Sequence, residues 1–275
     1  KVMKITNLKN NKLMPILIIS ILLIIVAFYF YPNKDTKIIS KQAVTNTQTT
    51  SISKNNPEKN EVKNTSDQSE TTKITNTIPK TFLNSKVPFA LQAPSANWDI
   101  IHEEACEETA IVIVKEYYSG NYKDLDSNQN EQKIQEIISW ERGNFGYFED
   151  TNIEKNQEIL MKMFNIKSEV IENPQINDIK QSLIDNKLIL VPSAGRLLRN
   201  PYFTGAGPIF HMVVIVGWDE NNFIVHDVGT KRGKEYKYPF EILLNANHDL
   251  YENAKFPLDA ELIKTGPKKI LRVYK

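Results

Sequence analysis

The single cysteine of the chain, Cys106, stands at the start of a helical pattern. Apolar residues follow it at the i, i+3, i+4 spacing of a buried helix face, among them Ala110, Ile111, Val114 and Tyr118. A thiol in the first turn of a helix lies near the positive end of the helix dipole, which favours the thiolate. Because the thiolate is the nucleophilic form, the sequence predicts a reactive cysteine with a depressed pKa. The alternative interpretation is a small buried hydrophobic residue.

Two other residues suit the same chemistry. His211 begins the apolar run HMVVIVGW, and Asp227 ends the run FIVHD. The polar turn between the runs predicts two antiparallel strands, which would place the two side chains next to each other. A carboxylate that orients an imidazole is the second half of a Cys-His-Asp triad, in which the imidazole takes the thiol proton and later protonates the leaving amine. Alternatively, His211 is a core histidine, and Asp227 starts a turn or pairs with Lys231 or Arg232.

Gln92 precedes Cys106 in a loop that contains proline and asparagine. A side-chain amide in this loop could join the backbone N–H of Cys106 in stabilising an oxyanion. An isolated glutamine is otherwise an ordinary surface residue. The candidate catalytic residues are therefore Cys106, His211, Asp227 and Gln92.

The elements that must position these residues lie in a globular region over residues 81–275. Periodicity predicts a helix that starts at Cys106, further helices at 131–142, 152–164 and 176–186, and a short helix at 239–247. Strands are expected at 168–171, 188–191, 210–218, 223–227, 234–238 and 270–274. The loop 192–208, rich in glycine and proline, is long enough to be functional. Helices first and an antiparallel sheet later predict an α+β fold.

Residues 13–31 form an uncharged apolar run behind a basic flank at residues 1–12. The run is long enough to cross a bilayer as a helix, and its bulky end does not suit cleavage as a signal peptide, the main alternative. Because the basic flank favours the cytoplasmic side, we expect a single-pass protein of the cell membrane with its globular domain outside the cytoplasm.

Residues 32–80 are rich in Thr, Ser, Asn and Lys and nearly lack aromatic residues. Such a segment buries too little apolar surface to offset chain entropy, so we expect a disordered linker. An adhesive or glycosylated stalk is the alternative interpretation.

Composition excludes several classes of function. The formal net charge of +1 and the absence of a basic patch with interleaved aromatic residues argue against nucleic-acid binding. One cysteine permits no intrachain disulfide. His102 and Cys106 have the i, i+4 spacing of a zinc pair, but no compact second pair of ligands exists, so we expect neither metal nor cofactor.

Four segments together resemble the bacterial cysteine peptidases related to the double-glycine leader (bacteriocin-processing) peptidases of the papain-like clan. The segments are VPFALQAP, HEEACEETA, HMVVIVGWDENNFIVHDVGTKRG and PFEILLNANHD. The resemblance covers nearly all of residues 81–275 and implies a papain-like fold. It also implies that Cys106 is the nucleophile, His211 the base, Asp227 the orienting acid and Gln92 the oxyanion glutamine.

The chain departs from that family pattern after the nucleophile and after the acid. Glu107 and Glu108 follow the cysteine where glycine is usual, and Val228 follows the aspartate where proline is common. Residues at i+1 and i+2 point away from residue i on a helix, so we expect the glutamates to act as ordinary acids at a helix N-terminus. The alternative is that they raise the pKa of Cys106.

The resemblance implies a membrane-anchored cysteine peptidase that hydrolyses peptide bonds in a peptide or protein substrate. No P-loop pattern accompanies the domain, so double-glycine specificity does not carry over. A catalytically inactive peptide-binding module and a cell-wall peptide amidase or transferase with the same triad are the alternatives. The sequence leaves the oligomeric state open.

Overall fold

The structure is a computed structural model that describes residues 77–275. The predicted basic flank 1–12, the transmembrane helix 13–31 and nearly all of the linker 32–80 lie outside the described residues. Within residues 77–275, no helix combines the length and apolar character that crossing a bilayer requires.

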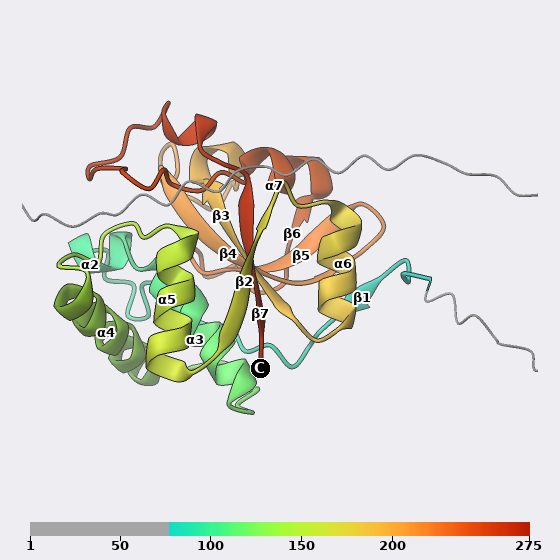
Figure 1. The fold of residues 1–275 in the computed structure, drawn as a ribbon, viewed down its shortest axis with the longest axis horizontal. Helices are drawn as coiled ribbons and strands as arrows, with labels where there is room; N and C mark the ends of the chain where they lie inside the picture. The colour runs from blue at the N-terminus through green and yellow to red at the C-terminus, as the bar shows by residue number, and fades with distance from the viewer. Residues whose placement is uncertain (1–76) are drawn as a thin grey trace, which may run out of the picture. The chain divides into compact units, whose positions relative to one another are not determined.

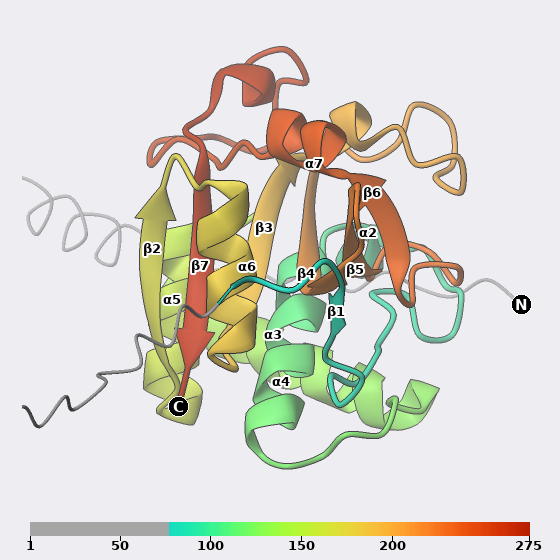
Figure 2. The same cartoon turned by 90° about the vertical axis from the view of Figure 1, so that its right-hand side faces the viewer.

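A seven-stranded antiparallel sheet forms the centre of the domain (Figures 1 and 2). Its strands are β1 (Phe82–Leu83), β2 (Lys167–Glu172), β3 (Leu188–Ala194), β4 (Phe210–Trp218), β5 (Asn222–Asp227), β6 (Tyr236–Pro239) and β7 (Lys269–Tyr274). The order across the sheet is β2-β7-β3-β4-β5-β6, and β1 pairs with the far end of β4.

Helices cover both faces of the sheet. They are α2 (Ile100–Glu103), α3 (Cys106–Tyr118), α4 (Ser127–Asn144), α5 (Ile153–Phe164), α6 (Ile176–Ile184) and α7 (Phe240–Ala246), with 3₁₀ turns η1 (Gly195–Leu198) and η2 (Ile263–Thr265). In Figure 1, α3, α4 and α5 lie on one side of the sheet, and α6 and α7 lie on the other. The domain therefore has three layers.

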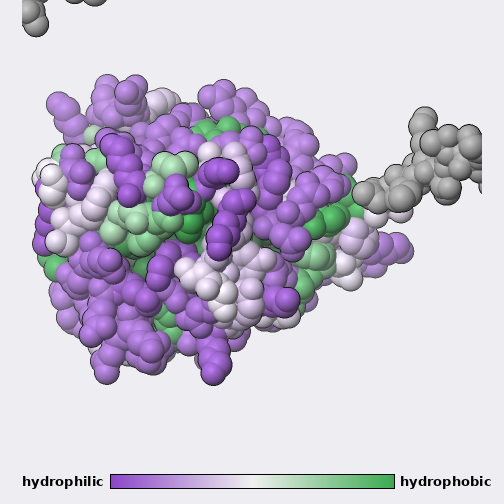
Figure 3. Space-filling view, turned by 60° about the horizontal axis from the view of Figure 1, so that its bottom comes forward, coloured by the Kyte–Doolittle hydropathy of each residue, from purple (hydrophilic) through white to green (hydrophobic). Residues whose placement is uncertain are grey.

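The strand sequences explain this layering. Every residue of β3 and β4 is buried, which requires cover on both faces. Side chains alternate between faces along a strand. Met212 and Val214 of β4 accordingly join the core cluster that contains α3, whereas Val213 and Ile215 join the cluster that contains α6 and α7. The face of the molecule in Figure 3 is mainly hydrophilic, with smaller groups of hydrophobic residues.

The α+β fold with an antiparallel sheet confirms the class expected from sequence, and the predicted helices and strands of residues 81–275 are all present within a few residues. Four short elements, β1, α2, η1 and η2, are additional. The predicted loop 192–208 starts later than expected because β3 continues to Ala194. The domain also starts earlier than residue 81, since Ile78 packs against the core and the Trp218 indole donates to the Pro79 carbonyl at 3.1 Å.

Candidate active site

Cys106 is the first residue of α3, and no side chain caps the first turn of this helix. The thiol side chain is free and only 3% exposed. It shares a core cluster with Phe210 and Met212, the two residues that flank His211 in β4. Because the first N–H groups of a helix have no partner within the helix, this turn offers backbone donors beside the sulfur.

The thiol makes its hydrogen bond to the neighbouring carboxylate. Cys106 Sγ donates to Glu107 Oε2 at 2.9 Å, and Glu107 Oε1 accepts from the Thr151 backbone N–H at 2.8 Å. The expectation that Glu107 points away from Cys106 is therefore wrong. The rule that residues i and i+1 point apart considers one helix by itself. Here Thr151, in the segment before α5, binds the Glu107 carboxylate and holds it beside the first turn of α3.

Burial, followed by the charge of Glu107, raises the pKa of the Cys106 thiol well above its ordinary value. The depressed pKa expected from the sequence is thus wrong for this form of the protein. The dipole of one helix contributes only about 0.3–1 kcal/mol at an exposed terminus. Loss of solvation by a fully buried group shifts a pKa by up to about 3–5 units and outweighs the dipole.

His211 and Asp227 lie together, as the sequence predicts. The strands β4 and β5 pair antiparallel, with Val213 opposite Asp227. His211 Nε2 lies 2.8 Å from Asp227 Oδ1, and both side chains are buried. Among residues 77–275, the ion-pair partner of Asp227 is His211 and not Lys231 or Arg232.

Two further residues hold the second carboxylate oxygen and were not predicted from the sequence. Asp227 Oδ2 accepts from Asn200 Nδ2 at 2.9 Å and from the Tyr238 hydroxyl at 2.6 Å. The Gly229 N–H donates to Oδ1 at 3.1 Å. Burial alone would raise the pKa of Asp227, but the charge of His211 and these hydrogen bonds hold it below its ordinary value.

If His211 and Asp227 act together in catalysis, replacing Tyr238 with phenylalanine is expected to lower kcat about tenfold or more, because a buried carboxylate loses one donor, which is worth about 1.5–3 kcal/mol for a charged partner. With that donor gone the pKa of Asp227 rises, so the acid limb of the pH–rate profile should move to higher pH. Kinetics over a pH series measure both effects. An unchanged acid limb would show that the hydroxyl only supports packing.

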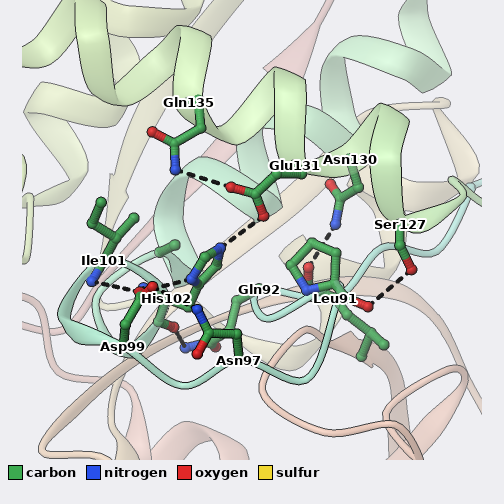
Figure 4. A network of polar contacts seen from close by, with 12 residues as sticks. Leu91, Gln92, Asn97, Asp99, Ile101, His102, Ser127, Asn130, Glu131 and Gln135 are labelled. Carbon is green, nitrogen blue, oxygen red and sulfur yellow. Dashed lines mark hydrogen bonds and ion pairs between the residues drawn. The ribbon is translucent and has the colours of Figure 1, made fainter.

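Gln92 is buried, and its backbone N–H donates to the Val228 carbonyl at 3.0 Å beside the end of β5. Its Nε2 donates to the carbonyls of His102 at 2.9 Å and Glu103 at 3.4 Å (Figure 4). In this form the amide is therefore committed to the carbonyls of α2, and an oxyanion would have to compete with them. The structure brings Gln92 to the site without placing a free donor there.

The loop that carries Gln92 is anchored by α4. Asn130 Nδ2 donates to the Leu91 carbonyl at 2.5 Å, and the Ser127 hydroxyl donates to the Pro94 carbonyl at 2.9 Å (Figure 4). Hydrogen bonds on both sides of Gln92 thus fix the backbone of the loop against one helix.

His102 belongs to the same network. Its ring nitrogens each lie 2.8 Å from a carboxylate, Nδ1 from Asp99 and Nε2 from Glu131 (Figure 4). Burial lowers the pKa of His102, but the bonds to the two acids raise it above its ordinary value. The His102 ring therefore links α2 to α4 through its ion pair with Glu131. In residues 77–275 no group of three His, Cys, Asp or Glu side chains is arranged to hold a metal ion, so His102 and Cys106 do not form part of one there.

A cleft of about 900 Å³ brings Gln92 and His211 to one surface. Acidic residues on its wall are Glu103, Glu104 and Asp150, basic residues are Lys231 and Arg232, and apolar residues include Trp98, Phe203, Phe256 and Leu258. Cys106 does not line this cleft. In the part of the chain that the structure describes, no hydrogen bond joins its thiol to the ring of His211.

Comparison with known proteins found one matching family and a similar solved structure. Residues 84–256 match the Peptidase_C39 like family, so the match includes all four candidate residues. The fold is also similar to the crystal structure of a protein from Bacillus anthracis assigned as a C39-like peptidase, with a TM-score of 0.47 and 15% sequence identity, over 72% of this chain and 98% of the other. No curated protein matches the chain. Since the family match spans more than half of the sequence, the chain belongs to the Peptidase_C39 like family and carries a cysteine peptidase-like domain.

Proposed function

We propose that the protein is a cysteine peptidase that hydrolyses peptide bonds with Cys106 as the nucleophile. The observation that carries the proposal is the buried pair of His211 and Asp227 at 2.8 Å, on a cleft that also contains Gln92. Family membership supports the same chemistry. With Nε2–H donated to Asp227, Nδ1 is the basic nitrogen of the imidazole.

In the proposed reaction the thiol proton moves from Cys106 to His211 Nδ1 while Sγ bonds to the carbonyl carbon of the substrate. The Cys106 N–H and the Gln92 amide stabilise the oxyanion of the tetrahedral intermediate. The imidazolium then protonates the leaving amine, which departs and leaves a thioester. Water attacks the thioester, gives its proton to His211, and releases the carboxylic acid and the thiol.

The lining of the cleft suits a peptide or protein substrate. Trp98 and Phe256 are about half exposed, at 50% and 52%, and can contact apolar side chains. The acidic and basic residues of the wall offer partners for charged side chains and for the polar backbone. A mixed lining of this kind fits a chain of varied residues better than a uniformly charged ligand.

A non-catalytic peptide-binding module is the second candidate. The observation that favours it is the buried Cys106 thiol, which within residues 77–275 hydrogen-bonds to Glu107 and not to His211. Incubation of the full chain with unstructured peptides and denatured proteins separates the two candidates, because only a peptidase yields cleavage that is lost in Cys106→Ala. Binding without cleavage by the wild type would identify the module.

We further propose that the domain is attached to the cell membrane through residues 13–31 and faces outside the cytoplasm. The proposal rests on the apolar run and on its basic flank. Protease added to intact cells should cut within residues 32–80 and release a fragment that begins close to the described domain. A domain that stays protected until the cells are lysed would contradict this topology.

A further inference from the structure

The hydrogen bond between Cys106 and Glu107 is held from both ends. Glu107 is 1% exposed, and its two carboxylate oxygens have different partners, the thiol at 2.9 Å and the Thr151 N–H at 2.8 Å. A carboxylate fixed in this way cannot swing into solvent without leaving the Thr151 N–H buried and unpaired, which costs about 1–3 kcal/mol. Glu107 is therefore a hydrogen-bond partner held in place beside the sulfur and not a mobile surface acid.

The surroundings of this pair carry further acids. Glu108 of α3 and Asp150 before α5 add negative charge near the thiol. Glu141 of α4 and Glu104 after α2 lie next to those two. In residues 77–275, no salt bridge to lysine or arginine involves Glu104, Glu107, Glu108, Glu141 or Asp150.

The uncompensated acids disfavour a second negative charge on the sulfur. Burial and the neighbouring acids raise the pKa of Glu107 and of Glu108 well above the ordinary value, and burial raises the pKa of Glu141 to about 8. These directions agree with the geometry, since each buried carboxyl group retains its proton more firmly when its neighbours are acids. Burial and the neighbouring acids disfavour a negative charge on the Cys106 thiol in the same way.

We propose that Glu107 controls the protonation of the nucleophile: it holds Cys106 as a neutral thiol until the sulfur leaves it for the imidazole of His211. The inference rests on the proposed peptidase function and deepens it. When the contact breaks, the thiol proton passes to His211 Nδ1, the sulfur becomes the thiolate and the ring becomes imidazolium. The buried acidic surroundings, which disfavour any new negative charge, then keep that thiolate strongly basic and nucleophilic.

The test compares the titration of the thiol in the wild type, Glu107→Gln and Glu108→Gln, each as the full chain. Ultraviolet absorbance of the thiolate, with Cys106→Ala as the blank, measures ionisation without requiring access to the sulfur. The rate of alkylation by iodoacetamide over the same pH series is the second measurement. Glutamine at position 107 keeps the size of the side chain and the oxygen that accepts from Thr151.

Glu107→Gln should lower the pH of half-ionisation by at least about one unit, because an acid in contact with the sulfur is replaced by a neutral amide whose N–H can donate to the thiolate. The alkylation rate at pH 7 should then rise about threefold or more, since the thiolate fraction rises tenfold per unit while the reactivity of each thiolate falls with its pKa. Glu108→Gln is the matched control. It removes a buried carboxyl group from the next position without touching the sulfur, so its shift should be clearly smaller.

Equal shifts in the two variants would overturn the proposal, because only the general field of the acids would then matter. An unshifted titration in Glu107→Gln would overturn it as well. If Glu107→Gln does not fold, the titration of the wild type alone decides. A pH of half-ionisation of Cys106 at or below that of a free thiol would contradict the role of Glu107. Peptide cleavage by the wild type is measured separately. If the titration shifts in Glu107→Gln but the wild type cleaves no peptide, the proposed peptidase function is wrong and the effect of Glu107 on the thiol still stands.

Discussion

Replacing Cys106 with alanine should reduce peptide hydrolysis to background, with a loss of kcat that approaches about 10⁶-fold, the scale seen when a nucleophile is removed from a complete triad. Alanine has no atom that can bond to the substrate carbonyl, and His211 and Asp227 then have no thiol to deprotonate. The change removes one buried sulfur. We therefore expect the free energy of unfolding to fall by about 1–2 kcal/mol, which leaves the domain folded.

The informative controls for this result are His211→Ala and the double variant. If the two residues act as a unit, each single change and the double change should lower kcat by similar factors, because effects within a triad are not additive. Initial rates with saturating peptide measure kcat, and thermal unfolding verifies the fold. Cleavage that persists in Cys106→Ala would mean that another nucleophile, or another protein in the sample, is responsible.

Gln92→Ala should lower kcat by about 10²–10³-fold, equivalent to about 2.7–4 kcal/mol, if its amide stabilises the oxyanion. KM should change little, because the carbonyl oxygen carries full charge only in the transition state. Alkylation of Cys106 by iodoacetamide should be nearly unchanged, since that reaction forms no oxyanion. Gln92→Glu should be at least as harmful, because a carboxylate repels the developing charge.

The contacts of Gln92 supply the control for this prediction. Its amide holds the carbonyls of His102 and Glu103, so Gln92→Ala also leaves acceptors unpaired and should destabilise the domain by about 1–3 kcal/mol. Asn130→Ala removes the bond to the Leu91 carbonyl and loosens the same loop, but it deletes no donor near the substrate. Equal losses of kcat in the two variants would assign Gln92 to loop positioning.

The pair of His211 and Asp227 could be predicted from sequence because its geometry is local. Two apolar runs joined by a short polar turn determine a hairpin, and the ends of a hairpin meet. Helix periodicity likewise located the start of α3 and therefore Cys106. In each case the chain within a few tens of residues contains all the necessary information.

The contacts that were missed join segments whose pairing no local pattern indicates. Glu107 turns toward the sulfur because Thr151, before another helix, binds its second oxygen. Asn200 reaches Asp227 from an irregular loop, and Tyr238 reaches it from the neighbouring edge strand β6. An isolated asparagine in a loop and a tyrosine in a short polar strand carry no signal that singles them out. Patterns within a single helix or strand do not predict contacts between separate elements.

The shortest elements were missed for a different reason. β1 has two residues and α2 has four, too few for any hydrophobic period to be visible. Both are held by tertiary contacts, β1 by β4 and α2 by the Gln92 amide and the charged bridge through His102. Their existence follows from the completed fold and not from local preference.

The distribution of the candidate residues along the chain affects when the domain could act during its own synthesis. Gln92 and Cys106 are translated well before His211 and Asp227, which lie on β4 and β5 after most of the helices. A nascent chain would therefore carry its thiol for some time without the imidazole that activates it. Because β4 pairs with strands on both sides and with β1 from the beginning of the domain, the base is oriented only as the sheet closes. If the proposed peptidase function holds, hydrolysis would start only after the chain has become compact, and a compact chain is a poor substrate for its own kind.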